Sequence, residues 1–317
     1  MKIKAAGLRV NDVIGVVAPA GTLFDRQALS KGLRLLNQMG FRTLVGKHVL
    51  AQCGYLAGSD AQRLEDLMTM FAHPDVRAIL CLRGGYGTLR LLPYIDFDLI
   101  RRHPKVFIGY SDVTALHLAI QKCCRLVTFH GPMLATDFGG LCSLYTREKF
   151  LQLVLSGARP AVIRNPPDGP ATITIFPGKA RGELVGGNLT LITALMGTPF
   201  EIETRGRVLF IEEVGEPPYR LDRMLTQLRL AGKLTAAAGI VVGECRDCAT
   251  AGQGSFTAMQ VFRDCLGDLG IPCFYGLSAG HGPHKATLPL GVEVTMDADK
   301  HTLRLEEKAV HESVAAV

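Results

Sequence analysis

Short apolar runs alternate with amphipathic stretches between residues 13 and 129. The apolar runs predict buried strands over 13–18, 43–45, 78–82, 106–109 and 126–129. The stretches between them predict helices, indicated by the stripes Leu29-Leu33-Leu36-Met39 and Leu64-Leu67-Met68-Phe71, the second with Asp60 as its cap, and by residues 113–121. Strands and helices that alternate at this spacing predict an α/β domain built around a parallel sheet.

The pattern changes after residue 141. Residues 142–179 contain the turn cluster Asn-Pro-Pro-Asp-Gly-Pro at 165–170 and are predicted to form a linker region. Beyond it, strands are predicted over 208–211 and 239–243, with a helix marked by Leu221, Met224, Leu225 and Leu228. We therefore expect two domains, 1–141 and 180–317, the second of α/β or mixed type.

Composition and charge narrow the class of protein. Of 317 residues, 48% are hydrophobic and 20% charged, as in soluble globular proteins. No apolar run approaches the ~18 residues of a membrane span, and the N-terminus lacks the features of a signal peptide, so we expect a cytoplasmic protein without a membrane partner. The net charge of +6 is scattered rather than clustered, which argues against a nucleic-acid partner and would suit a small anionic ligand.

The nine cysteines indicate reduced thiols rather than a disulfide framework. Cys245 and Cys248 have the spacing of half a redox or zinc site, but no second Cys-x-x-Cys or matching His pair accompanies them. We therefore expect no metal.

Two turns after predicted strands could take part in chemistry. Ser111, in Gly-Tyr-Ser-Asp at 109–112, stands between a strand and a helix, where ligands of parallel sheets bind and where helix N–H groups would face developing negative charge. Alternatively, Ser111 or Asp112 could simply cap the helix. The three glycines of Arg-Gly-Gly-Tyr-Gly at 83–87 could form half of an oxyanion hole, an anion cradle or an ordinary turn.

Two later segments offer an acid and a base. The strand at 208–211 ends in Glu212 and Glu213, where a carboxylate could orient an imidazole. Alternatively, both glutamates could face solvent or pair with Arg220 or Arg223. His281 lies in a loop bounded by glycine and proline, where it could be a general base or a surface residue. A serine, a strand-end glutamate and a loop histidine in this order match the nucleophile, acid and base of α/β-hydrolases.

Taken together, these segments resemble the LD-carboxypeptidase family of serine peptidases, which includes muramoyl-tetrapeptide carboxypeptidases and microcin-C immunity proteins. The matching stretches run in family order over nearly the whole chain: VVAPAG at 16–21, AGSD at 57–60, RGGYG at 83–87, GYSD at 109–112, HGPM at 130–133, GGNL at 186–189, IEEV at 211–214, YRLDR at 219–223, GH at 280–281 and LPLG at 288–291. Of these stretches, GYSD and GH…LPLG are the most specific for the family, whereas single glycine turns occur in many proteins.

The resemblance implies a Rossmann-like N-terminal domain, a smaller C-terminal domain and a homodimer, with no cofactor. It implies Ser111 as nucleophile, His281 as base and Glu212 as the acid that orients it, with the backbone amides of Gly85 and Asp112 as the oxyanion hole. Glu213 stands where relatives often carry Asp. Candidates for substrate binding are Arg83, Gly84, Tyr86 and Arg223.

The implied activity is the release of terminal D-alanine from an L-centred diamino acid in recycled cell-wall tetrapeptides, through an acyl-enzyme. One alternative is a microcin-immunity-type amidase that acts on aminoacyl-nucleotide analogues. Another, of a different class, is a non-catalytic sugar- or nucleotide-binding module whose glycine loops hold phosphate. Turnover that depends on Ser111 would distinguish an enzyme from such a module.

Overall fold

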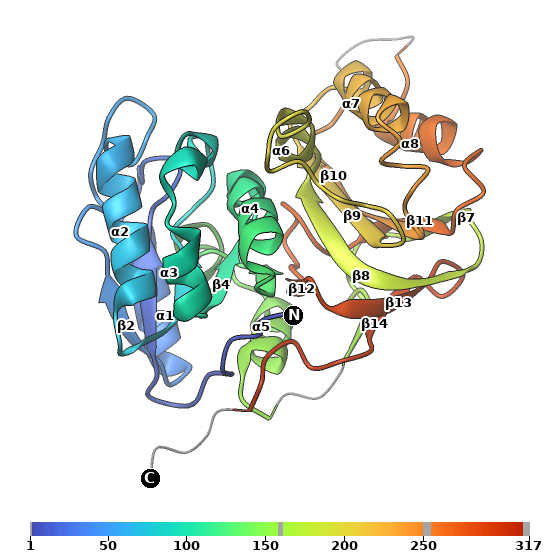
Figure 1. The fold of residues 1–317 in the computed structure, drawn as a ribbon. Coiled ribbons are helices and arrows are strands. Elements are labelled where there is room, and N and C mark those ends of the chain that lie inside the picture. The colour runs from blue at the N-terminus through green and yellow to red at the C-terminus, as the bar shows by residue number, and fades with distance from the viewer. Residues whose placement is uncertain (1, 158–160, 250–254, 313–317) are drawn as a thin grey trace. The chain divides into compact units, whose positions relative to one another are not determined.

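The computed structural model describes residues 2–157, 161–249 and 255–312. The chain forms two compact units. The first comprises Met1–Arg159 with Thr287–Gly291 and Lys308–Val317, and the second comprises Pro160–Ala286 with Val292–Glu307. A mostly parallel sheet with helices forms the first unit and a mixed, curled sheet with helices the second, which confirms the predicted α/β fold class (Figure 1).

The first unit is built on a sheet of six strands among the described residues. In spatial order they are β12 (Leu288–Leu290), β5 (Thr128–His130), β4 (Val106–Gly109), β3 (Val76–Cys81), β1 (Val13–Val17) and β2 (Arg42–Val45). Neighbouring strands are parallel except β12, which runs antiparallel to β5. The strands predicted in this half of the sequence are confirmed, with shifts of a few residues at their ends.

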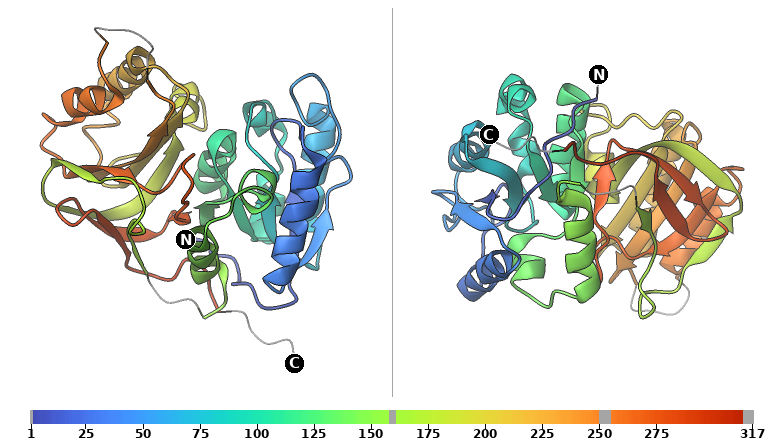
Figure 2. Two further views of the ribbon diagram at one scale, coloured as in Figure 1. Left: turned by 180° about the vertical axis from the view of Figure 1, so that it is seen from behind. Right: turned by 90° about the horizontal axis from the view of Figure 1, so that it is seen from below.

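Helices cover both faces of this sheet. They are α1 (Arg26–Gln38), α2 (Asp60–Ala72), α3 (Phe97–Arg102), α4 (Thr114–Cys124) and α5 (Leu144–Val154). Helices α2, α3 and α4 pack side by side on one face (Figure 1), and α1 covers the other (Figure 2). Because both faces are covered, β1 and β4 are buried along their whole length, as their uninterrupted apolar sequences require.

The start of α2 differs from the prediction. Ser59, not Asp60, is the N-cap: its hydroxyl accepts from the Gln62 N–H at 3.2 Å, and the Gln62 side chain accepts from the Ser59 N–H at 2.9 Å. This reciprocal pair is a capping box, which satisfies two N–H groups that the helix leaves free. Asp60 instead pairs with Arg63 and Arg90.

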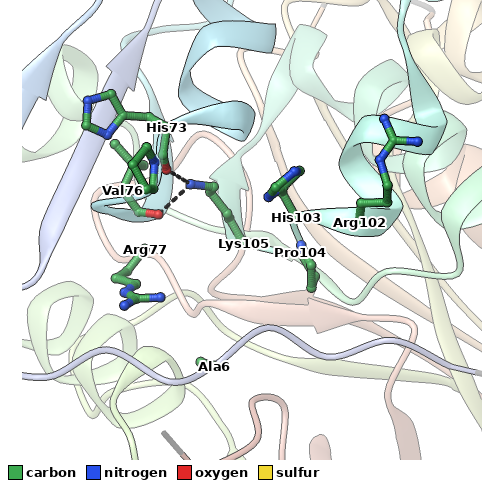
Figure 3. Close-up of a pocket in the computed structure, with 9 residues that line it drawn as sticks. Ala6, His73, Val76, Arg77, Arg102, His103, Pro104 and Lys105 are labelled. Carbon is green, nitrogen blue, oxygen red and sulfur yellow. Dashed lines mark hydrogen bonds between the residues drawn. The ribbon is translucent and has the colours of Figure 1, made fainter. Parts of the chain in front are cut away.

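A buried lysine, Lys105, lies at the edge of the first sheet where the parallel strands begin and binds backbone carbonyls there. Lys105, at the start of β4, donates to the backbone carbonyls of His73 and of Val76, the latter at 2.6 Å (Figure 3). Its side chain lines a cavity of about 230 Å³. Burial lowers the pKa of Lys105 to about 8. The ammonium thus joins the end of α2 to the starts of β3 and β4.

The second unit is built on a mixed sheet of eight strands among the described residues. In spatial order they are β6 (Val162–Ile163), β14 (Thr302–Leu305), β13 (Glu293–Asp297), β8 (Lys179–Asn188), β9 (Val208–Val214), β10 (Gly239–Arg246), β11 (Cys273–Leu277) and β7 (Ile173–Phe176). The central strands β8, β9, β10 and β11 are parallel, and the outer ones are antiparallel. Helices α6 (Leu189–Ala194), α7 (Pro218–Leu230) and α8 (Ala258–Leu266) lie in a row over the sheet (Figure 1).

The unit boundaries differ in detail from the expected ones. The expected linker 142–179 contains α5, β6 and β7. Residues 287–291, expected in the C-terminal domain, belong to the first unit because β12 pairs with β5 through the main chain. No helix in the described ranges is long and apolar enough to cross a membrane.

Candidate active site

Ser111 lies at the carboxyl end of β4 in a strained backbone conformation. Tyr110 is still extended, whereas Ser111 has φ +62° and begins a 3-10 turn that leads into α4. A positive φ is unfavourable for a residue with a Cβ and usually persists only where surrounding contacts enforce it. The turn therefore holds the serine in one orientation at the edge of the sheet where ligands of parallel α/β folds bind.

Neither Ser111 nor Asp112 caps α4 with its side chain. The start of the helix has no side-chain cap hydrogen bond. The buried Asp112 carboxylate accepts from the Thr88 N–H at 2.9 Å, and the Thr88 hydroxyl donates to the Asp112 carbonyl at 2.6 Å. Burial raises the pKa of Asp112, an effect that the Thr88 hydrogen bonds oppose. The interpretation of these residues as simple caps is therefore wrong.

The glycine loop approaches the serine closely. A Cβ at Gly84 would lie 2.9 Å from Ser111 Oγ and 3.7 Å from the Asp112 nitrogen. Gly85, with φ +125°, packs against Gly21, where a Cβ would meet the Gly21 Cα at 3.0 Å. Glycine is required at position 84 because a side chain there would collide with Ser111, and at position 85 because the positive φ and the contact with Gly21 both exclude a Cβ.

Two arginines hold the glycine loop in place. Arg83 donates to the carbonyls of Gly84 and Thr22, at 3.2 and 3.1 Å, and its guanidinium packs over Phe24. Arg63, a residue that the sequence analysis missed, is buried in α2 and donates to the Gly87 carbonyl at 3.0 Å. Its signal was a lone arginine beside the apolar stripe of a predicted helix.

The remaining substrate-binding candidates lie on exposed surfaces. Tyr86 is 48% exposed and packs edge-on against Tyr55, with ring centroids 5.6 Å apart. Arg223, on α7 of the second unit, lies over the exposed Tyr219 ring at 5.8 Å.

In the second unit, Glu212 and His281 form a hydrogen-bonded pair. Glu212, the fifth residue of β9, is fully buried, and its Oε2 lies 2.7 Å from His281 Nδ1. Gly280 has φ +122°, and a Cβ there would lie 2.9 Å from Glu212 Oε2. At Gly243 a Cβ would lie 3.2 Å from the Glu212 Cβ. Because Gly280 and Gly243 have no side chains, the Glu212 side chain can reach His281 without a collision.

Glu213 points away from this pair. Its carboxylate accepts from the Asn188 amide at 2.8 Å and from the N–H groups of Thr190 and Val214, at 2.7 and 2.9 Å. Burial raises the pKa of Glu213. Since side chains alternate along a strand, β9 directs Glu212 toward the imidazole and Glu213 toward the start of α6.

The histidine of α4 has a structural role. His117 is fully buried, and its Nε2 lies 2.9 Å from the Gly109 carbonyl, so the ring supports the end of β4 beneath Ser111. Burial lowers the pKa of His117 to about 4.

This depressed pKa predicts acid sensitivity. Between pH 6.5, the ordinary value, and about 4, the unfolded chain binds a proton that folded His117 resists, so stability should fall as the pH falls. We expect wild type to lose up to roughly 3 kcal/mol more than His117→Gln when urea unfolding is compared at about pH 7 and about pH 4. Equal losses would contradict this role of His117.

Cys245 and Cys248 are free thiols at the end of β10 and just beyond it. Burial raises the pKa of both thiols. Within the described ranges, no group of three or more His, Cys, Asp or Glu side chains could hold a metal ion.

Two family models match this chain. Residues 14–131 match the model of the LD-carboxypeptidase N-terminal domain, and residues 181–296 that of the C-terminal domain. The chain is 43% identical over 309 residues to the "probable murein peptide carboxypeptidase" of Bacillus subtilis (strain 168), covering 96% of this chain and 95% of that protein.

Two solved structures are similar as well. The muramoyltetrapeptide carboxypeptidase of Oxalobacter formigenes is 30% identical, with a TM-score of 0.80, over 92% of this chain and 97% of that one. MccF, solved in complex with glutamyl sulfamoyl guanosine, is 26% identical, with a TM-score of 0.89, over 97% and 99%. Both halves of the chain, and nearly its whole length, therefore place it in the LD-carboxypeptidase (peptidase S66) family of serine peptidases.

Proposed function

We propose that the protein is a serine LD-carboxypeptidase that releases the terminal D-alanine of murein tetrapeptides. In this proposal Ser111 is the nucleophile, His281 the general base and Glu212 the acid that orients it. The hydrogen bond of 2.7 Å between buried Glu212 and His281 is the observation that carries the proposal. A carboxylate on Nδ1 selects the tautomer with a proton there, which leaves the Nε2 lone pair to accept a proton.

The reaction then needs no redox partner. Ser111 Oγ attacks the carbonyl carbon of the diamino acid while His281 accepts the hydroxyl proton, and His281 passes that proton to the leaving nitrogen of D-alanine. Water, deprotonated by His281, then cleaves the acyl-enzyme and regenerates Ser111. The backbone N–H groups of Gly85 and Asp112 would hold the oxyanion, because Gly84 brings the loop against the serine.

We propose different roles for the remaining candidates, Arg83, Tyr86 and Arg223. Arg83 is engaged with two loop carbonyls, so it would act by holding the glycine loop rather than by contacting substrate. The exposed Tyr86 ring and the Arg223 guanidinium would contact the substrate itself.

The names of relatives support murein peptides as the substrate class. The Bacillus subtilis protein, at 43% identity, is a probable murein peptide carboxypeptidase, and the Oxalobacter formigenes structure is a muramoyltetrapeptide carboxypeptidase. The similarity to MccF supports a second candidate, an amidase that acts on aminoacyl-nucleotide analogues. We favour the murein substrate because identity to MccF is lower, at 26%.

The test is the stereochemistry of release. We expect D-alanine to leave a murein tetrapeptide much faster than L-alanine leaves the otherwise identical peptide, by about a hundredfold in kcat/KM, because inverting a centre displaces the carbonyl from the oxyanion hole. An amidated D-alanine peptide should also be slower. Free alanine is measured by chromatography, with an aminoacyl sulfamoyl adenosine as the competing substrate.

Each result separates the candidates. Equal rates for the three peptides would contradict the LD-carboxypeptidase activity. Hydrolysis of the sulfamoyl nucleotide alone would favour the MccF-like amidase, and neither activity would favour the binding module.

We also propose a cytoplasmic homodimer. The support is the resemblance of the chain to the LD-carboxypeptidase family. Light scattering during gel filtration should give twice the chain mass of 34.2 kDa.

A further inference from the structure

A cavity of about 380 Å³ lies in the second unit beside the loop that carries His281. Glu244 and Arg246, at the end of β10, line it together with Tyr275 of β11 and Pro283. Arg246 connects the cavity with the catalytic loop, because its Nη1 donates to the His281 carbonyl at 3.2 Å. None of the steps proposed for Ser111, Glu212 and His281 uses this cavity.

A bulge in β10 sets up the two charged side chains. The pairing of β10 with β9 shifts between Val242 and Cys245. Gly243 lies at the shift, and a Cβ there would be 2.4 Å from the Ala279 carbonyl oxygen, so the strand passes very close to the neighbouring loop. At this irregularity the strand does not alternate simply, and Glu244, Cys245 and Arg246 all line the cavity.

One carboxylate oxygen of Glu244, Oε1, is buried without a hydrogen-bond donor among the described residues. The carboxyl packs against Gly282, where a Cβ would lie 1.8 Å from Oε2. Burial raises the pKa of Glu244, while Lys285, His284 and Arg246 oppose that shift. A buried acceptor without a donor is costly, so a ligand N–H that reached Glu244 would be strongly favoured.

The Arg246 guanidinium has N–H groups beyond the one that bonds the His281 carbonyl. One nitrogen bonds the His281 carbonyl, and Nε lies 3.7 Å from the neighbouring Asp247 carboxylate, beyond a hydrogen bond. A guanidinium carries five N–H groups in a fixed fork, so further donors remain for a carboxylate. The side chain is 53% exposed and therefore within reach of a ligand.

We propose that this cavity binds a zwitterionic amino-acid head group, with Glu244 receiving the ammonium and Arg246 the carboxylate. The inference rests on the proposed function, in which a diamino acid precedes the scissile bond. Diaminopimelate ends its side chain in one carbon that bears both an ammonium and a carboxylate. Lysine, the other common diamino acid, has only the ammonium. The cavity would thus select peptides by the side chain on the acyl side of the cleaved bond.

The experiment compares three tetrapeptides that differ only in the third residue: meso-diaminopimelate, its distal carboxamide, and L-lysine. We expect wild type to prefer the diaminopimelate peptide over both others by about tenfold or more in kcat/KM, because a site built for hydrogen bonds leaves them unmade with an analogue. Arg246→Ala should bring that preference close to one. Glu244→Gln should weaken all three peptides, since each keeps the distal ammonium.

The ratio of kcat/KM between the diaminopimelate and lysine peptides shows whether Arg246→Ala removes a contact with the substrate or disturbs the His281 loop in general. Loss of the Arg246 bond to the His281 carbonyl would slow every peptide equally and leave the ratio unchanged. The matched control is Arg229→Ala, which removes a guanidinium of the same unit that pairs with Asp268 on the surface. It should leave both rates and ratio as in wild type.

Binding measured by calorimetry with the Ser111→Ala variant keeps this inference separate from the activity. If Ser111→Ala binds the diaminopimelate peptide more tightly than the lysine peptide, and if adding Arg246→Ala removes that preference, the cavity assignment is supported. This holds even if wild type releases no D-alanine, because the lack of release would overturn only the proposed activity. Release of D-alanine at equal kcat/KM from the diaminopimelate and lysine peptides would overturn the cavity assignment. A preference that survives Arg246→Ala would overturn it as well.

Discussion

Ser111→Ala should reduce kcat/KM for a murein tetrapeptide by at least about 10⁴-fold, because removal of a covalent nucleophile eliminates the acyl-enzyme route. Folding should be little affected, since the Ser111 side chain makes no cap hydrogen bond at the start of α4. Initial rates of D-alanine release and urea unfolding measure the two effects. A variant that turned over at a near wild-type rate would remove Ser111 from the mechanism.

Two companion variants sharpen this result. Ser111→Gly should be equally inactive yet about 1 kcal/mol more stable than Ser111→Ala, because only glycine adopts φ +62° without strain. Ser143→Ala is the matched control: the Ser143 hydroxyl caps α5 by accepting from the Thr146 N–H at 3.2 Å. Its loss should cost about 1 kcal/mol of stability and leave the rate unchanged.

Glu212→Gln should lower kcat by about 10³- to 10⁴-fold with a small effect on KM, because the amide no longer selects the tautomer that leaves Nε2 unprotonated. His281→Ala should lose at least as much. The double variant should be no slower than His281→Ala alone, since the members of a triad act as a unit. Losses that multiplied in the double variant would mean that Glu212 acts on something other than His281.

Glu213→Gln is the matched control for the acid. Glu213 is equally buried in the same strand but accepts hydrogen bonds from Asn188, Thr190 and Val214. A neutral amide there would leave at least one donor poorly satisfied, at about 1–3 kcal/mol. We expect this variant to unfold at lower urea while retaining a kcat within about tenfold of wild type. The opposite pattern, full stability with lost activity, would assign the orienting role to Glu213.

The sequence by itself determined the five parallel strands of the first sheet and the chemistry available at its edge. Short continuous apolar runs such as 106–109, alternating with amphipathic stripes, predict strands covered on both faces by the helices that the stripes mark. The serine turn followed from a strand that ends where a helix begins. These features are local, because each depends on residues a few positions apart along the chain.

The tertiary structure decided what local pattern could not. Alternation along β9 required Glu212 and Glu213 to face opposite sides, but which side holds His281 depends on a loop 69 positions later. Likewise β6 and β7, inside the expected linker, exist because they pair with β14 and β11. Turn residues at 165–170 masked these short strands, since strand pairing with distant partners leaves no periodic signal in a few residues.

The same reason applies to β12 and to Arg63. Leu288–Leu290 leaves the second unit to become an edge strand beside β5, through backbone bonds that any apolar sequence could make. Arg63 is buried and donates to the carbonyl of Gly87, 24 positions away, so its place beside the apolar stripe of α2 could not by itself reveal this role. The sequence specifies which groups the chain carries, whereas the pairing of distant segments determines which of them meet, because that pairing reflects the packing of the whole unit rather than any local preference.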